Sequence, residues 1–357
     1  MRMIGLVAAA LLLGAPSQLP SADNLTLTAV EGIKVGHFTL ARRPTGCTVI
    51  LAKDGTVGSV DVRGGAPGTR ETDLLNPVND VQVVNAIVLA GGSAFGLDAA
   101  SGAVKWLDEH HVGYPVGSAG VVPIVPSAVL IDLWFGGDPK IRPGPDCGYR
   151  AADAASTATV VEGNVGAGAG ATVGKTGGIV AVGNAGPMKA GIGSAAIKYP
   201  NGLVVAAIAA VNAVGDVIDP MTGQVIAGVR GADGRLADAR QRLRTGTGRD
   251  ARAGENTTIG VIATNARLTK VQAQKVAQMA HDGYARAISP VHTPADGDTI
   301  FSLATGTWTG DVGYGIVGAL AAEVMADAVV RAATQATGSH GLPSARDLGT
   351  VPARFKQ

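Results

Sequence analysis

The sequence GENTTIGVIATNARLTK, residues 254–270, decides what fold and chemistry are expected of this chain. The apolar run that begins at Ile259 is typical of a strand covered on both faces. Directly before this run stand Asn256, Thr257 and Thr258. The chain therefore places one amide and two hydroxyl groups at the start of its most strand-like segment, and their purpose has to be explained.

Composition excludes several classes of partner. The chain has 357 residues, of which 16% are charged, and its net charge is +1. Such a balance supplies no long-range field to attract nucleic acid or an anionic membrane, so neither is expected as a partner. With 52 glycines and 4% aromatic residues, the interior is expected to bring backbones close together.

The first 22 residues have the architecture of a signal peptide. An arginine near the terminus precedes an apolar run, and small residues surround Ser21 and Ala22. The apolar part is short for a membrane span, although an uncleaved anchor is the alternative. The mature fold is therefore expected to start near residue 23, and the protein to be exported, either periplasmic or secreted.

The two cysteines, Cys47 and Cys147, leave two interpretations open. They could form one bridge in an oxidising compartment, or they could be two buried free thiols. No spacing in the chain suggests a metal, and no cofactor is expected. The six histidines form no HExxH motif, and each is interpreted as a surface residue or a satisfied core residue (His37, His110, His111, His281, His292 and His340).

Apolar runs rich in Val and Ile predict strands, and patterns with helical spacing lie between and after them. Because the strands are apolar almost continuously, they are expected to be covered on both faces, in a layered α/β sandwich with helices outside and sheets within. The predicted strands are residues 25–30, 46–52, 84–92, 202–212 and 257–265, and the predicted helices are 96–110, a helix following Thr269, and 316–334.

Three polar or proline-rich segments are predicted to be surface loops. They cover residues 67–80, 136–150 and 230–255. The last is charged, rich in glycine and leads directly to Asn256, so it is interpreted as an exposed linker.

A second stretch of interest is HTPADGDTIFSLAT, residues 292–305. Here Asp296 and Asp298 flank Gly297 just before a predicted strand. Residues two apart project to the same side of an extended chain, so both carboxylates can face one site. A plain Asp-Gly turn entering a strand is the alternative.

The two stretches combine into one chemical hypothesis. A threonine hydroxyl is a poor nucleophile until a base takes its proton, and the residue's own α-amine can be that base. A free α-amine has a pKa of about 7.7 to 8.0, which suits neutral pH. Such an amine exists on Thr257 only if the peptide bond after Asn256 is broken.

The stretches at 255–270 and 292–305, together with AGGSAFGLDAASG at 90–102, resemble the self-processing DmpA-type (P1) peptidases. That family includes β-aminopeptidases and nylon-oligomer hydrolases, and Asn-Thr-Thr with a downstream Asp-Gly-Asp resembles the nylon-hydrolase branch. The resemblance implies an αββα sandwich and self-cleavage between Asn256 and Thr257. The products would be an α chain of residues 23–256 and a β chain of residues 257–357.

The resemblance also implies roles for single residues. Thr257 matches the nucleophile, and Asp296 and Asp298 match the acidic pair that orients and polarises its α-amine. Lys175 matches a lysine of the active site, with a solvated loop lysine as the alternative. Asn212 matches an asparagine that donates to the oxyanion, with a strand-ending turn residue as the alternative. One departure is Ile131, where some relatives have a tyrosine.

The function expected from these features is an amide hydrolase acting on N-terminal peptide bonds or on ω-amino-acid oligomers such as those of 6-aminohexanoate. The resemblance further implies a homotetramer of α/β heterodimers. Two other classes stay open: an acyltransferase on a related self-cleaving scaffold, and a non-catalytic glycine-rich binding protein in which the Thr and Asp residues only form turns.

Overall fold

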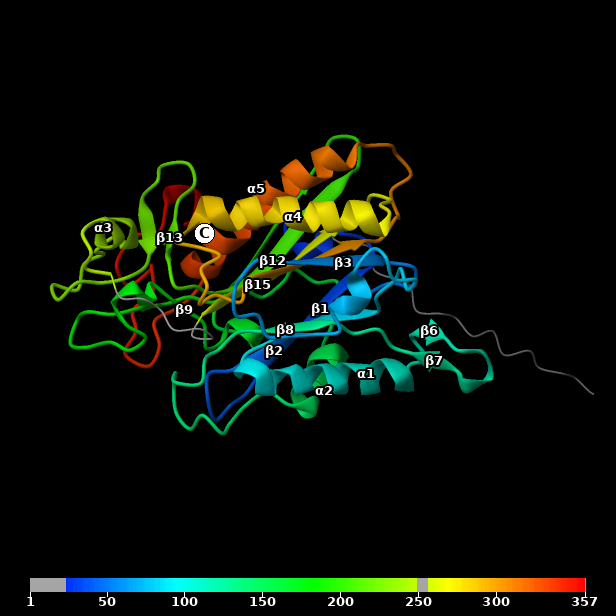
Figure 1. Ribbon diagram of the computed structural model, residues 1–357, viewed down its shortest axis with the longest axis horizontal. Coiled ribbons are helices and arrows are strands. Elements are labelled where there is room, and N and C mark those ends of the chain that lie inside the picture. The colour runs from blue at the N-terminus through cyan, green and yellow to red at the C-terminus, as the bar shows by residue number, and fades with distance from the viewer. Residues whose placement is uncertain (1–23, 249–255, 357) are drawn as a thin grey trace, which may run out of the picture.

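The computed structural model describes residues 24–248 and 256–356, so the predicted signal peptide lies outside the described residues. Within them, the two largest sheets have five strands each (Figure 1). Sheet A contains β1 (Ile33–Thr39), β2 (Gly46–Ala52), β5 (Ala86–Ala90), β8 (Ser127–Val129) and β4 (Thr69–Arg70), in that order. Sheet B contains β11 (Ile192–Lys198), β12 (Val204–Asn212), β15 (Thr257–Thr264), β17 (Thr299–Ala304) and β3 (Val57–Val62), also in spatial order.

The two sheets enclose one apolar core, and each sheet carries a further apolar cluster on its outer face. In β12, Ala206 and Ile208 belong to the cluster shared with sheet A, whereas Val205 and Ala207 belong to the cluster under the helices. Successive side chains of a strand point to opposite faces. A strand between two cores is therefore apolar along its whole length, which is why these runs show no polar alternation.

Helices cover both outer faces. The helices α1 (Ala99–Glu109) and α2 (Pro145–Asp153) pack on sheet A, and α4 (Lys270–Ala287) and α5 (Tyr314–Thr334) pack on sheet B (Figure 1). The order helix, sheet, sheet, helix confirms the predicted αββα sandwich. Of the helices that the structure describes, none has the apolar length that a membrane crossing needs.

The start of α4 illustrates why the sequence folds this way locally. Thr269 and Gln272 form a capping box, in which each side chain bonds the backbone N–H of the other residue. This pairing satisfies N–H groups that the first helical turn leaves unbonded. The helix predicted after Thr269 is therefore confirmed, as is the long apolar helix predicted at 316–334.

Smaller elements surround this frame. Near the start of β15, β13 (Asp216–Ile218) pairs with β14 (Val225–Ala227) and with β16 (Ile288–Ser289). The remaining short elements are the pair β9 (Thr172–Val173) and β10 (Met188–Lys189), the hairpin β6 (Tyr114–Pro115) and β7 (Val121–Val122), and the short helix α3 (Ala239–Arg244).

The prediction of a strand at residues 25–30 is wrong. This segment contains a 3₁₀ helix, Leu27–Ala29. Side chains take the bonds that a strand would form: Asn24 Oδ1 accepts from Thr26 N at 3.0 Å, and Leu27 N donates to Ser194 Oγ at 2.8 Å. Local side-chain bonding of this kind competes with a strand ladder.

Two predicted loops contain more structure than expected. In the segment 136–150, α2 begins at Pro145, a residue whose fixed φ suits the first helical position. In the segment 230–255, α3 begins after Asp238, whose side chain accepts from Arg240 N at 3.0 Å. The linker is therefore shorter than predicted, and residues 249–255 lie outside the described residues.

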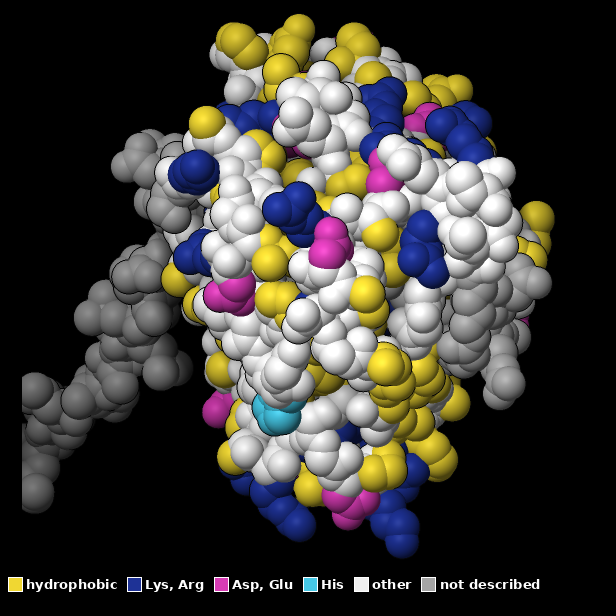
Figure 2. Space-filling model, turned by 90° about the vertical axis from the view of Figure 1, so that its left-hand side faces the viewer, with side chains coloured by type: hydrophobic (Ala, Val, Ile, Leu, Met, Phe, Trp, Pro, Cys, Tyr) yellow, Lys and Arg dark blue, Asp and Glu magenta, His cyan; other side chains and the backbone are white. Residues whose placement is uncertain are grey.

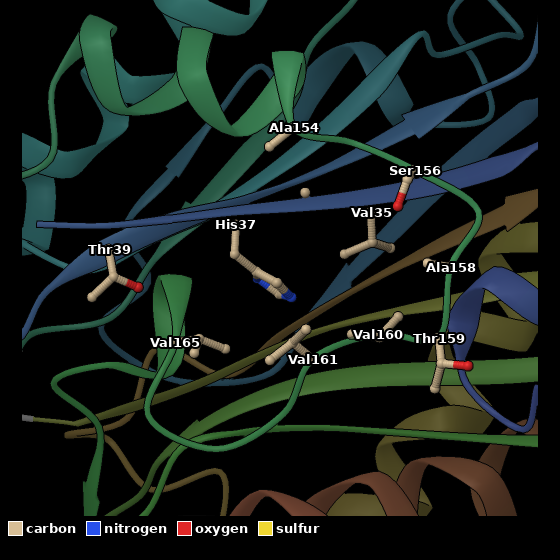
Figure 3. Close-up of a pocket in the computed structure, with 11 residues that line it drawn as sticks. Val35, His37, Thr39, Ala154, Ser156, Ala158, Thr159, Val160, Val161 and Val165 are labelled. Atoms are coloured by element: carbon tan, nitrogen blue, oxygen red, sulfur yellow. The ribbon is translucent and has the colours of Figure 1, made fainter.

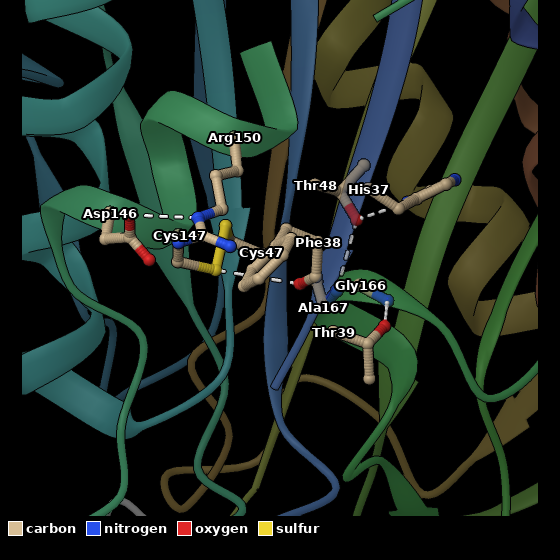
Figure 4. Close-up of a disulfide and its surroundings, with 10 residues drawn as sticks. All are labelled: His37, Phe38, Thr39, Cys47, Thr48, Asp146, Cys147, Arg150, Gly166 and Ala167. Carbon is tan, nitrogen blue, oxygen red and sulfur yellow. Dashed lines mark hydrogen bonds and ion pairs between the residues drawn. A yellow bond between two sulfur atoms is a disulfide. The ribbon is translucent and has the colours of Figure 1, made fainter. Parts of the chain in front are cut away.

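The cysteines form a disulfide that ties α2 to sheet A (Figure 4). Cys47 lies in β2 and Cys147 in α2, with 6.1 Å between their Cα atoms. Of the two interpretations left open by the sequence, the structure contains the bridge.

Candidate active site

The start of β15 brings the predicted residues together from three neighbouring strands. β15 lies between β12, which is antiparallel to it, and β17, which is parallel. Thr257 is the first residue of β15 and pairs with Asn212, the last residue of β12. On the other side, Asn256 forms a bridge with Asp296, just before β17. Residues far apart in sequence therefore meet at one end of sheet B.

The peptide bond between Asn256 and Thr257 is buried at this point. Asn256 is 0% exposed and Thr257 is 4% exposed. The Thr257 hydroxyl donates a hydrogen bond to the carbonyl oxygen of Asn256. The same oxygen accepts the backbone N–H of Gly297 at 3.1 Å. A hydroxyl and an N–H donor therefore converge on one carbonyl group.

Asp298 is fixed by three donors. Its Oδ1 accepts the backbone N–H of Thr258 at 2.8 Å, and its Oδ2 accepts the backbone N–H of His292 at 3.0 Å. His292 Nδ1 lies 2.9 Å from the same Oδ2 atom. The carboxylate thus links the residue that follows Thr257 to the loop before β17.

Asp296 is also buried, and its environment disfavours its charge. Its Oδ1 accepts from Val214 N at 3.4 Å, and its Oδ2 accepts from the backbone and hydroxyl of Thr293. Burial, followed by the neighbouring charge of Asp298, raises the pKa of Asp296 to about 6, while Lys175 acts in the opposite direction. Perturbed carboxyl groups of this kind are typical of functional sites.

Lys175 and Asn212 form a second part of the site. Lys175 is 2% exposed, and its Nζ donates to Asn212 O at 2.9 Å and to Asn212 Oδ1 at 2.8 Å. Asn212 Nδ2 donates to the carbonyl oxygen of Ile131 at 2.9 Å. The alternative of a solvated loop lysine is therefore wrong. Asn212 does end a strand, as the alternative interpretation of a strand-ending turn residue stated, but its side chain belongs to a hydrogen-bonded cluster.

Ile131 contributes to the site through its backbone carbonyl group, whereas some relatives have a tyrosine hydroxyl at this position. The carbonyl oxygen of Ile131 orients the Asn212 amide. Thr172 N donates to the other end of that amide, at 3.1 Å from Asn212 Oδ1. The amide group is therefore held at both ends, which fixes the direction of its remaining N–H bond.

Sequence reasoning brought five residues to this site and missed two. The five are Thr257, Asp296, Asp298, Lys175 and Asn212. In the sequence, Gly297 stands out only as the residue between two aspartates, and His292 is predicted to be a surface residue or a satisfied core residue. Gly297 contributes its backbone N–H, and His292 contributes through the conformation of its loop. Neither feature can be recognised from the amino-acid sequence. The signal that was present is the closeness of both residues to Asp298 in the sequence.

A separate cavity of about 350 Å³ lies along β1, away from these residues (Figure 3). Val35, Val160 and Val165 supply much of its apolar lining, and His37 borders it. None of the predicted site residues lines it. In the part of the chain that the structure describes, no group of three or more His, Cys, Asp or Glu residues is arranged to hold a metal ion.

Among the described residues, the face of the molecule on the side of α3 carries no single charged patch. Figure 2 shows basic side chains separated from one another by acidic, polar and apolar groups on this face. This distribution agrees with the small net charge of the chain.

Two solved structures with the same fold are aminopeptidases. The L-aminopeptidase D-Ala-esterase/amidase of Ochrobactrum anthropi, described as a variant of the Ntn (N-terminal nucleophile) hydrolase fold, superposes with a TM-score of 0.69 at 18% identity, covering 95% of this chain and 96% of the other. A β-aminopeptidase of Burkholderia sp. superposes with a TM-score of 0.66 at 20% identity, covering 97% and 96%. The fold is therefore that of the Ntn hydrolases.

The family follows from the sequence comparison. The model of peptidase family S58 matches residues 26–345, and the chain belongs to this family. An uncharacterized aminopeptidase of Mycobacterium tuberculosis is 42% identical, covering 90% of this chain and 97% of its own length. A 6-aminohexanoate-oligomer endohydrolase of Kocuria sp. is 32% identical, covering 85% and 84%. The prediction that the nylon-hydrolase branch is nearest is not confirmed, because the mycobacterial protein shares more residues.

Proposed function

We propose that this protein cuts its own chain between Asn256 and Thr257, and that Thr257 then acts as the N-terminal nucleophile of an amide hydrolase. The observation that carries the proposal is the pair of donors on the Asn256 carbonyl oxygen. Thr257 Oγ lies next to the carbonyl that it would attack, and Gly297 N–H is 3.1 Å from the oxygen on which negative charge would develop. A preorganised donor at that place stabilises the transition state of acyl transfer.

The self-cleavage reaction is an acyl shift followed by hydrolysis. Thr257 Oγ adds to the Asn256 carbonyl carbon, the C–N bond breaks, and the nitrogen takes up a proton as the α-amine of Thr257. Water then opens the resulting ester, which restores the hydroxyl and leaves a carboxylate on Asn256. No cofactor is required.

In the mature enzyme the same hydroxyl would attack a substrate amide. The new α-amine removes its proton and returns it to the leaving amine. The resulting acyl-enzyme is hydrolysed by water. The second N–H of the Asn212 amide is the proposed donor to the substrate oxyanion, because Ile131 and Thr172 hold the amide in one orientation. Asp296 and Asp298 are proposed to orient and polarise the α-amine.

The two products of cleavage are expected to stay together. All eight residues of β15 pair with β12, which would belong to the larger chain. β17, in the smaller chain, also pairs with β3 in the larger one. Separating the chains would therefore expose the centre of sheet B and its core.

The proposed substrates are N-terminal peptide bonds and oligomers of ω-amino acids. The names of the relatives support both classes, since one group is named aminopeptidases and the other 6-aminohexanoate-oligomer endohydrolases. A hydrolysis panel of α-peptides, β-peptides and 6-aminohexanoate oligomers decides between them. Adding amine acceptors to the same assay detects the acyltransferase alternative.

Export and assembly remain part of the proposal. The Cys47–Cys147 disulfide supports an oxidising compartment, because reduced thiols prevail in the cytosol. A homotetramer of α/β heterodimers is proposed from the family resemblance alone, and sedimentation of the purified protein tests it.

Denaturing electrophoresis with terminal sequencing tests the central step. The unaltered chain should give two fragments, and the smaller should begin at Thr257. The variant Thr257→Ala should give one intact band. Thr258→Ala is the matched control, since it removes the neighbouring hydroxyl and should leave the cut in place. An uncut chain that hydrolyses amides at full rate would contradict the proposal.

A further inference from the structure

His292 contacts Asp298 through two separate donors. Its backbone N–H and its ring Nδ1 lie 3.0 Å and 2.9 Å from Asp298 Oδ2. His292 adopts a positive φ of 54°, in the left-handed region that few side chains favour. His292 therefore contacts Asp298 Oδ2 through both its backbone and its side chain.

The other oxygen of Asp298 reaches the nucleophile's neighbour. Oδ1 accepts Thr258 N at 2.8 Å, and Thr258 follows Thr257 directly. Bonds from N–H groups to a carboxylate are shorter and stronger than neutral ones. Asp298 thus links two parts of the chain: one oxygen bonds to His292, and the other bonds to the backbone next to Thr257. A shift of His292 would therefore move the backbone that carries Thr257.

A polar cluster lies behind the His292 ring. The ring centroids of His281 and Tyr284, both on α4, lie 4.8 Å and 6.2 Å from that of His292. His281 Nε2 lies 3.1 Å from the backbone oxygen of Asp61, and 3.5 Å from its carboxylate. The imidazole of His292 therefore lies between the α4 residues His281 and Tyr284 and the carboxylate of Asp298.

A contribution to folding stability does not explain why His281, Tyr284 and His292 are polar. His292 Nε2, His281 Nδ1 and the Tyr284 hydroxyl are buried, and none has a hydrogen-bond partner among the described residues. Each unsatisfied group costs about 1 to 3 kcal/mol. Apolar side chains of the same size would fill the space without that cost. The feature of His292 that an apolar residue could not replace is its bond to Asp298.

We propose that His292 is a positioning residue, which holds Asp298 and, through the Thr258 amide, places the Thr257 hydroxyl against the Asn256 carbonyl. This inference rests on the proposed function of Thr257. It assigns His292 a role in the rate of self-cleavage that is separate from its contribution to folding.

Two substitutions at one position separate these contributions. His292→Gly removes the imidazole and tolerates the positive φ, so the backbone is not strained. His292→Asn also tolerates that φ, and its side-chain amide can donate to Asp298 as Nδ1 does. His111→Gly is the matched control, because His111 also has a positive φ, 56°, and is exposed.

The assay follows self-cleavage of newly synthesised full-length chain over time in a cell-free reaction. A displacement of 1 Å at a reacting group costs about 100-fold in rate, so His292→Gly is expected to slow cleavage by about 10- to 100-fold. His292→Asn should recover to within about threefold of the unaltered chain, and His111→Gly should not differ from it. Melting temperatures, measured in the uncleavable Thr257→Ala background, should be similar for the Gly and Asn variants.

A double-mutant cycle provides the second measurement. If His292 acts through Asp298, then combining His292→Gly with Asp298→Asn should be no slower than Asp298→Asn alone. Additive losses would overturn the inference, as would a Gly variant that cleaves at the normal rate or an Asn variant as slow as Gly. If the unaltered chain stayed uncut, the proposed function would fail first and the inference with it.

Discussion

Gly297→Ala should slow self-cleavage, because no room exists for a methyl group at this position. A Cβ on Gly297 would lie 2.8 Å from Thr257 Oγ and 2.7 Å from the backbone oxygen of Ala66. Ordinary contact begins at 3.4 Å, so the hydroxyl or the Gly297 backbone has to move by about 0.6 Å. Thr257 is β-branched and has little freedom to turn away.

The expected size follows from that displacement. A misplacement of 1 Å costs about 100-fold in rate, so a shift of about half that size should cost about tenfold. Tenfold corresponds to about 1.4 kcal/mol in the barrier. The same shift also moves the Gly297 N–H, which donates to the Asn256 carbonyl oxygen at 3.1 Å.

A time course of fragment formation measures this effect. Gly313→Ala is the matched control, since its φ of −61° is ordinary and a Cβ there meets nothing within 4 Å. The control should cleave at the normal rate. If Gly297→Ala cleaved as fast as Gly313→Ala, Gly297 would not lie against the reacting hydroxyl and the geometry proposed for self-cleavage would be refuted.

Two further predictions concern stability. The pKa of Asp296 is raised from 3.8 to about 6, so its protonation stabilises the fold; that contribution is complete below pH 3.8 and is lost as the pH rises through 6. In the Thr257→Ala background, the free energy of unfolding relative to Asp296→Asn should therefore increase from pH 7 to pH 4, and a constant difference in urea titrations would contradict the assignment. Cys147→Ser should lower the free energy of unfolding by about 4.7 kcal/mol, because the bridge closes a loop of 100 residues; a reductant should destabilise only the unaltered chain.

Much of the fold could be predicted because its strands are covered on both faces. The strand predicted at residues 46–52 matches β2, and that at 257–265 differs from β15 by one residue. The strand predicted at 25–30 failed because Thr26 bonds locally to Asn24 and the backbone N–H of Leu27 donates to Ser194 Oγ. That partner lies more than 160 residues away, and no local pattern reveals it.

In the candidate site, too, some residues could be predicted from the sequence and others could not. Thr257, Asp296 and Asp298 stand out because hydroxyl and carboxylate groups occur directly before apolar strands. Lys175 and Asn212 came from the family resemblance, and only the structure places them in contact. His292 could not be predicted, because its role depends on a left-handed loop conformation that turns its ring and its N–H towards one carboxylate.

The amino-acid sequence by itself determined the layers of this protein and the residue at which it is expected to cut itself, because the periodicity of apolar residues and the reactivity of a hydroxyl are local properties. Tertiary structure alone decided what surrounds that hydroxyl. Antiparallel pairing set Asn212 beside Thr257, and parallel pairing set Asp296 beside Asn256. Hydrogen-bond direction and burial arise only when strands distant in sequence meet, so the Gly297 N–H and the raised pKa of Asp296 could come from the folded chain alone.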